Sequence, residues 1–113
     1  MRPDLQPQDS LSQVVFVHDY VQLVFQDCSF SLYNRLTYQN GGSILRQGES
    51  GFCDALVSLI GRAASVKTVN GKLSLHFTNG ASVLVSSSGP DVRGPEAWIF
   101  YQLGCPMVVE QNA

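Results

Sequence analysis

Charged residues are scarce in this sequence, and basic residues are not in excess. Asp, Glu, Lys and Arg form 14% of the 113 residues, whereas soluble domains usually contain about one quarter. The formal net charge is -2, and a nucleic-acid-binding domain normally shows a basic stripe. We therefore expect no nucleic-acid partner, although an acidic protein can still bind a basic one. The apolar content of 44% predicts a well-buried chain with one apolar or aromatic surface reserved for a partner.

Long apolar runs are also absent, since none approaches the roughly 20 residues of a transmembrane helix. The first ten residues, MRPDLQPQDS, are polar, contain two prolines and lack the apolar segment of a secretory signal. We therefore expect no membrane partner. The predicted organisation is a flexible N-terminal arm over residues 1–12 and a single β-rich domain over residues 13–113.

Cysteines are too few and too widely spaced for a disulfide framework. Cys28, Cys53 and Cys105 are an odd number and show no recognisable spacing. We interpret them as small buried apolar residues of a protein in a reducing compartment, the cytoplasm.

Alternating apolar residues dominate what is present. Val21, Leu23 and Phe25 fall on one face of a predicted strand, with turns expected near His18-Asp19 and Asp27-Cys28. The second turn returns the chain along SFSLYNRLTY, and QNGG at 39–42 marks a further turn before a short strand, SILRQ.

The second half of the chain repeats this pattern. Asn70-Gly71 and Asn79-Gly80 predict two hairpin turns, because both central positions of such a turn need positive φ. Between these turns, Leu73, Leu75 and Phe77 point to one packed face. The stretch EAWIFYQLG is apolar on both faces and predicts a central strand, and CPMVVEQNA adds an edge strand.

One segment has helical spacing instead. Phe52, Leu56, Leu59 and Ile60 share one helical face, so a helix of about three turns is predicted at about 51–61. Ser50 is the expected N-cap, Asp54 lies in the first turn, and Gly61 is the expected terminator.

These elements predict an α+β, β-rich fold. We expect an antiparallel sheet, folded as a β-sandwich or half-barrel of about eight strands built from hairpins, with the single helix packed on it. The segments 21–34 and 73–86 share a pattern in which Phe25 matches Phe77 and Asp27 matches Asn79. A true duplication and ordinary β-strand patterning both remain open.

No motif in the sequence predicts catalysis. His18-Asp19 with a cysteine could form a nucleophilic site, but the pair lies at an expected turn. His76 is expected on the wet face of its strand, and two histidines without paired cysteines do not make a zinc site. The glycines do not form a phosphate-binding loop. We expect no catalytic residue, no metal and no cofactor, while a converging carboxylate pair stays open.

A family resemblance is carried by GKLSLHFTNGASVLV and the following GPEAWIFYQ. Together with VQLVFQDCSFSLYN, these motifs resemble a family of small bacterial domains found among the immunity proteins of polymorphic and contact-dependent growth-inhibition toxins, over roughly residues 13–110. The ending CPMVVEQNA departs from the glycine-rich tail of that family, which leaves the position of the last strand open.

The resemblance implies a non-enzymatic cytoplasmic protein that binds and neutralises a cognate toxin C-terminal domain, expected to be a nuclease, by blocking its active site. A basic toxin cleft would be met by carboxylates, and the candidate contacts are Glu49, Asp54, Asp91 and Glu96. The alternatives are a homodimeric interaction module without a toxin, built on an exposed sheet edge, and a small enzyme.

Three roles are possible for the Glu96 side chain: a structural contact with its loop, a contact with a partner, and catalysis. It precedes the aromatic residues Trp98, Phe100 and Tyr101, which we interpret as core residues before interface anchors. The preferred reading for Glu96 is a clamp on its loop, through backbone N–H groups or through Arg93 or Arg62. Partner contact comes second and catalysis last.

Overall fold

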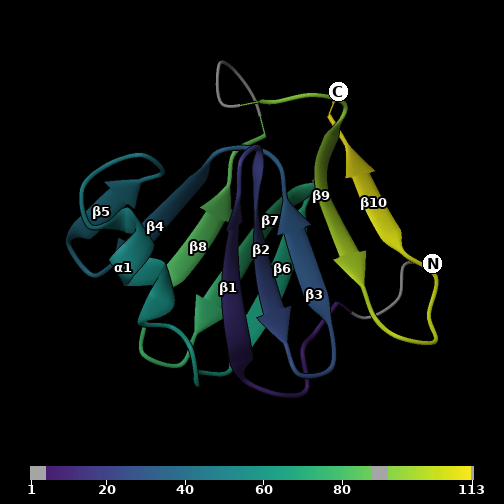
Figure 1. Ribbon diagram of the computed structural model, residues 1–113, viewed down its shortest axis with the longest axis horizontal. Helices are drawn as coiled ribbons and strands as arrows, with labels where there is room; N and C mark the ends of the chain where they lie inside the picture. The colour runs from purple at the N-terminus through teal and green to yellow at the C-terminus, as the bar shows by residue number, and fades with distance from the viewer. Residues whose placement is uncertain (1–4, 88–91, 113) are drawn as a thin grey trace.

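The chain forms a sandwich of two five-stranded antiparallel sheets with one short helix (Figure 1). The computed structural model describes residues 5–87 and 92–112. The first sheet has the order β1-β2-β3-β9-β10 and the second the order β5-β4-β8-β7-β6. The elements are β1 (Leu11–Val17), β2 (Tyr20–Phe25), β3 (Ser29–Leu32), β4 (Leu36–Asn40), β5 (Ser43–Arg46), α1 (Phe52–Val57), β6 (Ala64–Val69), β7 (Lys72–Phe77), β8 (Ser82–Val85), β9 (Glu96–Tyr101) and β10 (Val108–Gln111). The expected β-rich α+β class is confirmed, as a sandwich.

The two halves of the chain have the same order of elements. β1, β2 and β3 form a meander in the first sheet, after which the β4–β5 hairpin crosses to the second. β6, β7 and β8 form the matching meander in the second sheet, and the β9–β10 hairpin crosses back. The matched rings of Phe25 and Phe77 stack across the core, 6.4 Å apart. The arrangement agrees with the repeated pattern, while its origin in duplication stays a prediction.

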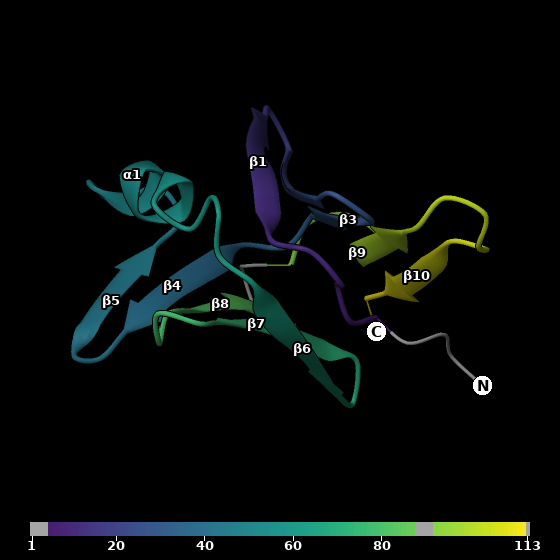
Figure 2. The ribbon, with the colours of Figure 1, turned by 90° about the horizontal axis from the view of Figure 1, so that it is seen from below.

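Strand alternation builds the core between the two sheets, which Figure 2 shows as separate layers. Leu23, Phe30, Leu75 and Trp98 are fully buried. The indole N–H of Trp98 donates to the carbonyl of Gly71 at 3.1 Å. This bond joins the first sheet to the β6–β7 turn of the second, so the tryptophan is a core residue.

The helix is shorter than predicted and starts differently. α1 ends at Val57, and turns continue to Gly61, whose N–H donates to the Leu11 carbonyl at 2.8 Å. This pairing with the β1 edge removes residue 61 from a helix. The predicted N-cap Ser50 is wrong, because Gly51 occupies that position with φ 91° and no side chain caps the helix. Ile60 is 44% exposed and does not join the packed face.

Three strand predictions are also corrected. The predicted return strand over residues 29–38 is broken into β3 and β4, which belong to different sheets. β9 is an interior strand, paired with β3 on one side and β10 on the other, but its outer face is not covered as predicted, because Tyr101 is 45% exposed. The described residues form ten strands, rather than about eight.

The two Asn-Gly turns differ. Asn70 and Gly71 have φ of 52° and 79° and form the expected tight turn. At the second turn Gly80 has positive φ and Asn79 does not, because three residues separate the paired Phe77 and Ala81. This longer loop matches a hairpin turn closed by a glycine bulge.

The predicted N-terminal arm contacts the sandwich from Leu5 onward. Leu5 is buried, and β1 already begins at Leu11. The Gln6 amide accepts from the Val66 N–H at 2.8 Å and donates to the Val66 carbonyl at 2.6 Å. The segment around Gln6 therefore covers part of the β6 edge, and residues 11 and 12 belong to β1, so the described part of the predicted arm is not free. Within the described residues, no helix has the length and apolar character needed to cross a membrane.

Candidate functional site

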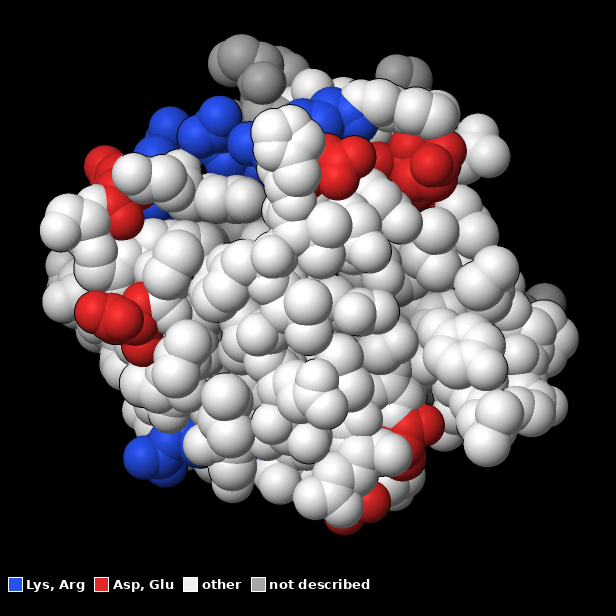
Figure 3. Space-filling model, in the orientation of Figure 1, with Lys and Arg blue, Asp and Glu red and all other residues white. Residues whose placement is uncertain are grey.

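The outer face of the first sheet carries no charged side chain. Register and alternation place the inward residues of β2, such as Leu23, in the core, so the residues between them point to solvent. Figure 3 shows this area as uncharged and bordered by charged groups above and below. We call it the uncharged face. It consists of Gln13, Val15, Val17, Tyr20, Gln22, Val24, Ser29, Ser31, Tyr33, Ile99, Tyr101 and Val109.

The composition of the uncharged face resembles that of protein interfaces. Three tyrosines lie on it, and the rings of Tyr20 and Tyr33 contact each other with centroids 5.0 Å apart. Interface centres are poor in charge and rich in aromatic side chains. Tyrosine and serine together supply rigid contact area and adaptable hydrogen bonds. The pattern therefore fits a surface that binds another protein.

The outer face of the second sheet is different. It carries Lys67 and Lys72. His76 lies on the same face, as the sequence predicted. The ring nitrogens of His76 lie 3.0 Å from the hydroxyl of Ser74 and 3.1 Å from that of Ser82. These contacts hold the ring on a polar, partly charged surface.

Glu96 lies at one end of the uncharged face, in a hollow of about 300 Å³. Asp19, Tyr33, Arg93 and Pro95 line the same hollow. Burial raises the pKa of the Tyr33 hydroxyl, and the charges of Tyr20, Glu96 and Asp19 raise it further. Two carboxylates and Arg93 therefore lie beside Tyr33, and the carboxylates offer acceptors to a hydrogen-bond donor. We call this site the Glu96 hollow.

Asn34 positions the loop that forms this hollow. Its side chain is 1% exposed, and its Oδ1 accepts from the Arg93 N–H at 3.1 Å. Its Nδ2 donates to the carbonyl of Ser86 and to Oδ1 of Asn112. The chain crosses from the first sheet to the second at Asn34, and it crosses back between β8 and β9. The Asn34 amide hydrogen-bonds to residues of the second crossing and so holds the two crossings side by side. Sequence reasoning missed this residue, because a single Asn between two strands looks like a turn residue.

The other predicted acidic contacts are not gathered with Glu96. Glu49 is exposed, and its Oε1 accepts from the Arg46 N–H at 2.6 Å, which closes the turn after β5. Asp54 is exposed in the first turn of α1. Figure 1 places β5 and α1 at the opposite side of the molecule from β9. Asp91 lies outside the described residues. Of the two arginines proposed for Glu96, Arg93 shares its hollow.

His18 and Cys28 are not brought together. His18 lies at the turn before β2, and Cys28 follows the turn after it, so the length of the strand separates them. Burial, followed by the neighbouring Asp27 charge, raises the pKa of the Cys28 thiol to about 12. The thiol stays protonated at neutral pH and is a poor nucleophile. The other two cysteines, Cys53 and Cys105, are exposed, so the prediction that all three are buried is wrong for them. Within residues 5–87 and 92–112, no group of three or more His, Cys, Asp or Glu could hold a metal.

Comparisons with known proteins do not identify a family. No family model matches the chain, and no curated protein or solved structure matches it either. The resemblance to the immunity proteins therefore stays a prediction.

Proposed function

We propose that this protein is a non-enzymatic binding protein that captures one partner protein on the uncharged face. The observation that carries the proposal is the absence of charge from that whole face, in a region that exposes three tyrosines. An interface of standard size needs about 800 Å² on each partner. The twelve outward residues of the uncharged face would form the centre of such an interface, and the surrounding turns would complete it.

The Glu96 hollow supports a partner with basic groups at the rim of the contact. Asp19 and Glu96 bring two carboxylates next to Tyr33 at the border of the uncharged face. Rim charges speed the encounter between proteins, and buried aromatic residues slow dissociation. Glu96 then has two roles: it lines the loop site with Arg93, and it contacts the partner.

We propose further that the partner is a toxin domain and that the protein acts as its immunity protein in the cytoplasm. This part rests on the resemblance of the hairpin and Glu-Ala-Trp motifs. A nuclease has a basic cleft that holds its substrate. The uncharged face and the Glu96 hollow suit such a cleft, because one supplies anchors and the other supplies negative charge.

The test is co-expression with the protein encoded immediately upstream, followed by co-purification and a growth-rescue assay. We expect stable association and restored growth. The Glu96→Lys variant should weaken association and rescue, whereas Asp54→Lys, which changes an exposed carboxylate on α1, should retain both. The absence of association and of rescue by the unmodified protein would contradict the proposal.

A homodimer is the second candidate, and one observation favours it. β1 is an edge strand of seven residues without charge, and its Phe16 and Val17 are 44% and 39% exposed. Edge strands without lysine or proline pair readily with another strand. Light scattering of the purified protein distinguishes the candidates, since a stable dimer of 12.3 kDa chains supports the second and a monomer excludes it.

A further inference from the structure

A pocket lies at the end of the uncharged face opposite the Glu96 hollow. It has a volume of about 220 Å³. Ser29, which lines the pocket, begins β3, and Tyr33, which lines the hollow, follows the same strand. The uncharged face therefore has a depression at each end of β3.

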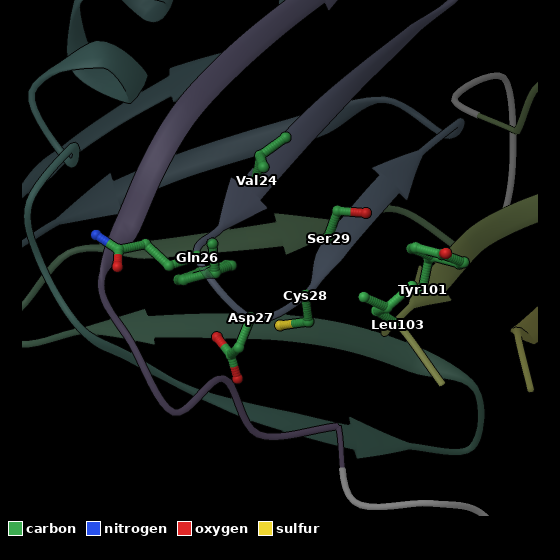
Figure 4. Close-up of a pocket in the computed structure, with 8 residues that line it drawn as sticks. Val24, Gln26, Asp27, Cys28, Ser29, Tyr101 and Leu103 are labelled. Atoms are coloured by element: carbon green, nitrogen blue, oxygen red, sulfur yellow. The ribbon is translucent and has the colours of Figure 1, made fainter. Parts of the chain in front are cut away.

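The strand register explains why the surface is hollow at this point. Ser29 is paired with Val24 of β2 on one side and with Tyr101 of β9 on the other. All three side chains point outward, because strand residues alternate and the next residue of β3, Phe30, is buried. A short serine side chain between two larger ones leaves a depression. Leu103, from the segment after β9, lines a further side of it (Figure 4).

The polar groups beneath the pocket are engaged by the protein itself. Oδ2 of Asp27 accepts from the Gln8 N–H at 2.8 Å, and Oδ1 of Asp27 is buried. The Cys28 thiol forms a hydrogen bond with this carboxylate, and burial raises the pKa of the thiol to about 12, so it is uncharged at neutral pH. Figure 4 shows the Asp27 carboxylate pointing away from Tyr101 and Leu103. The pocket therefore offers a ligand its apolar walls rather than a charge.

These walls expose apolar surface that a ligand would cover. Tyr101 is 45% exposed and Leu103 is 84% exposed. Large apolar side chains exposed beside a depression are typical of protein contact sites. An apolar cavity of about 150 Å³ holds a benzene molecule, so this pocket has room for the side chain of phenylalanine or leucine.

We propose that this pocket, the Ser29 pocket, binds one large apolar side chain of the partner protein, of phenylalanine or leucine size. The inserted group lies over Ser29, between Val24 and Tyr101, and packs against Leu103. Three of these four residues belong to the uncharged face, so a partner that covers the face also covers the pocket. The source of the side chain rests on the proposed function. The pocket gives the contact an apolar anchor at one end of β3, and anchors that fill pockets slow dissociation.

The first measurement uses a small probe, so it does not depend on the partner. The full-length protein, labelled with ¹⁵N, is titrated with benzyl alcohol, which carries the phenylalanine ring, and glycerol serves as the control ligand. We expect saturable amide shifts at Val24, Cys28, Ser29, Tyr101 and Leu103 with benzyl alcohol alone. A probe of this size should bind in roughly the millimolar range.

Three variants make the measurement specific. Ser29→Leu fills the pocket with its own side chain and should abolish the shifts. Ser82→Leu is the matched control and should retain them, because Ser82 begins the third strand of the second meander as Ser29 begins that of the first, but lies on the outer face of the other sheet. Leu103→Asp changes an exposed side chain outside the strands and places a charge beside the ligand, so binding should weaken at least tenfold.

The second measurement uses the co-purified partner and titration calorimetry with the same variants. Ser29→Leu and Leu103→Asp should each weaken association at least tenfold, and Ser82→Leu should stay within about threefold of the unmodified protein. These results would assign the inserted side chain to the partner.

The contradicting results separate the two proposals. Equal shifts with glycerol, or shifts that Ser29→Leu retains, would overturn the apolar site. Unchanged partner binding by Ser29→Leu and Leu103→Asp would overturn the anchor and leave the proposed function standing. Failure of the co-purification experiment would remove the partner, and with it the source of the side chain, even if benzyl alcohol binds.

Discussion

Asn34 stabilises the crossings between the two sheets through hydrogen bonds that its neighbours in the sequence do not predict. Its side chain bonds to residues 52, 59 and 78 positions away in the chain. A sequence pattern reports on neighbours and on periodicity, and neither contains these partners. The place of Glu96 at the start of a strand could be predicted because it follows a Gly-Pro loop, but its neighbours Asp19 and Tyr33 come from distant parts of the chain. The candidate site was therefore only partly predictable.

Replacement of Asn34 by Ala should be strongly destabilising. The change removes the hydrogen bonds that the Asn34 side chain makes with the Arg93 N–H, the Ser86 carbonyl and Asn112. We expect a loss of about 2–4 kcal/mol in the free energy of unfolding, measured by urea denaturation. Asn40→Ala is the matched control, since its amide makes one weak bond to the Tyr38 hydroxyl. Its loss should stay within about 1 kcal/mol, and equal losses would contradict the role of Asn34.

Cys28 should make the stability of the protein fall at alkaline pH. In the unfolded chain its thiol ionises from about pH 9, and in the folded protein its pKa is about 12, because burial disfavours the thiolate. The stability contribution is therefore complete below pH 9 and is lost as the pH rises towards 12.

Urea unfolding at pH 8 and pH 10.5 measures this effect. The unmodified protein should lose up to about 2 kcal/mol more between the two values than the Cys28→Ala variant. The comparison cancels the other groups that titrate in this range. An equal loss in both proteins would show that the thiol is not protected by the fold.

At the scale of elements, local rules predicted most strands and misjudged the helix. The Asn70-Gly71 turn was predictable, because its positive φ values are a property of two adjacent residues. The end of α1 was not, because Gly61 pairs with Leu11, fifty positions earlier. The apolar periodicity of residues 52–60 continues past the helix, since Leu59 is buried from a turn. Periodicity alone cannot separate these cases.

The start of α1 gives a paired prediction. Gly51 has φ 91°, where an alanine side chain is strained, and a Cβ there would meet only ordinary contact with Leu45. Gly51→Ala should therefore cost about 1–2 kcal/mol through backbone strain. Ser50→Ala should change stability by less than about 0.5 kcal/mol, because Ser50 is exposed and is not the N-cap. A larger loss at Ser50 than at Gly51, measured by thermal or urea unfolding, would restore the original helix prediction.

At the scale of the whole molecule, the assignment of strands to sheets lay beyond the sequence. β3 and β4 alternate in the same way whether they continue one sheet or cross to the other. The crossing places β9 and β10 beside β3 and so completes a five-stranded sheet with one uncharged outer face. The low charge content predicted such a surface in general terms. The location of this surface depends on which sheet each hairpin joins. The β4–β5 hairpin joins the sheet of β6, β7 and β8, and the β9–β10 hairpin joins the sheet of β1, β2 and β3.

The binding role of the uncharged face is tested by placing the same positive charge on each sheet in turn. Gln22 lies at the middle of this face on β2, and Gln39 is exposed on the outer side of the second sheet on β4. Each is changed to Lys, and titration calorimetry measures the affinity for the co-purified partner. Gln22→Lys should weaken binding about 100-fold or more, because it buries an unpaired charge. Gln39→Lys should stay within about threefold of the unmodified protein. Equal effects, or a larger effect at Gln39, would contradict the account.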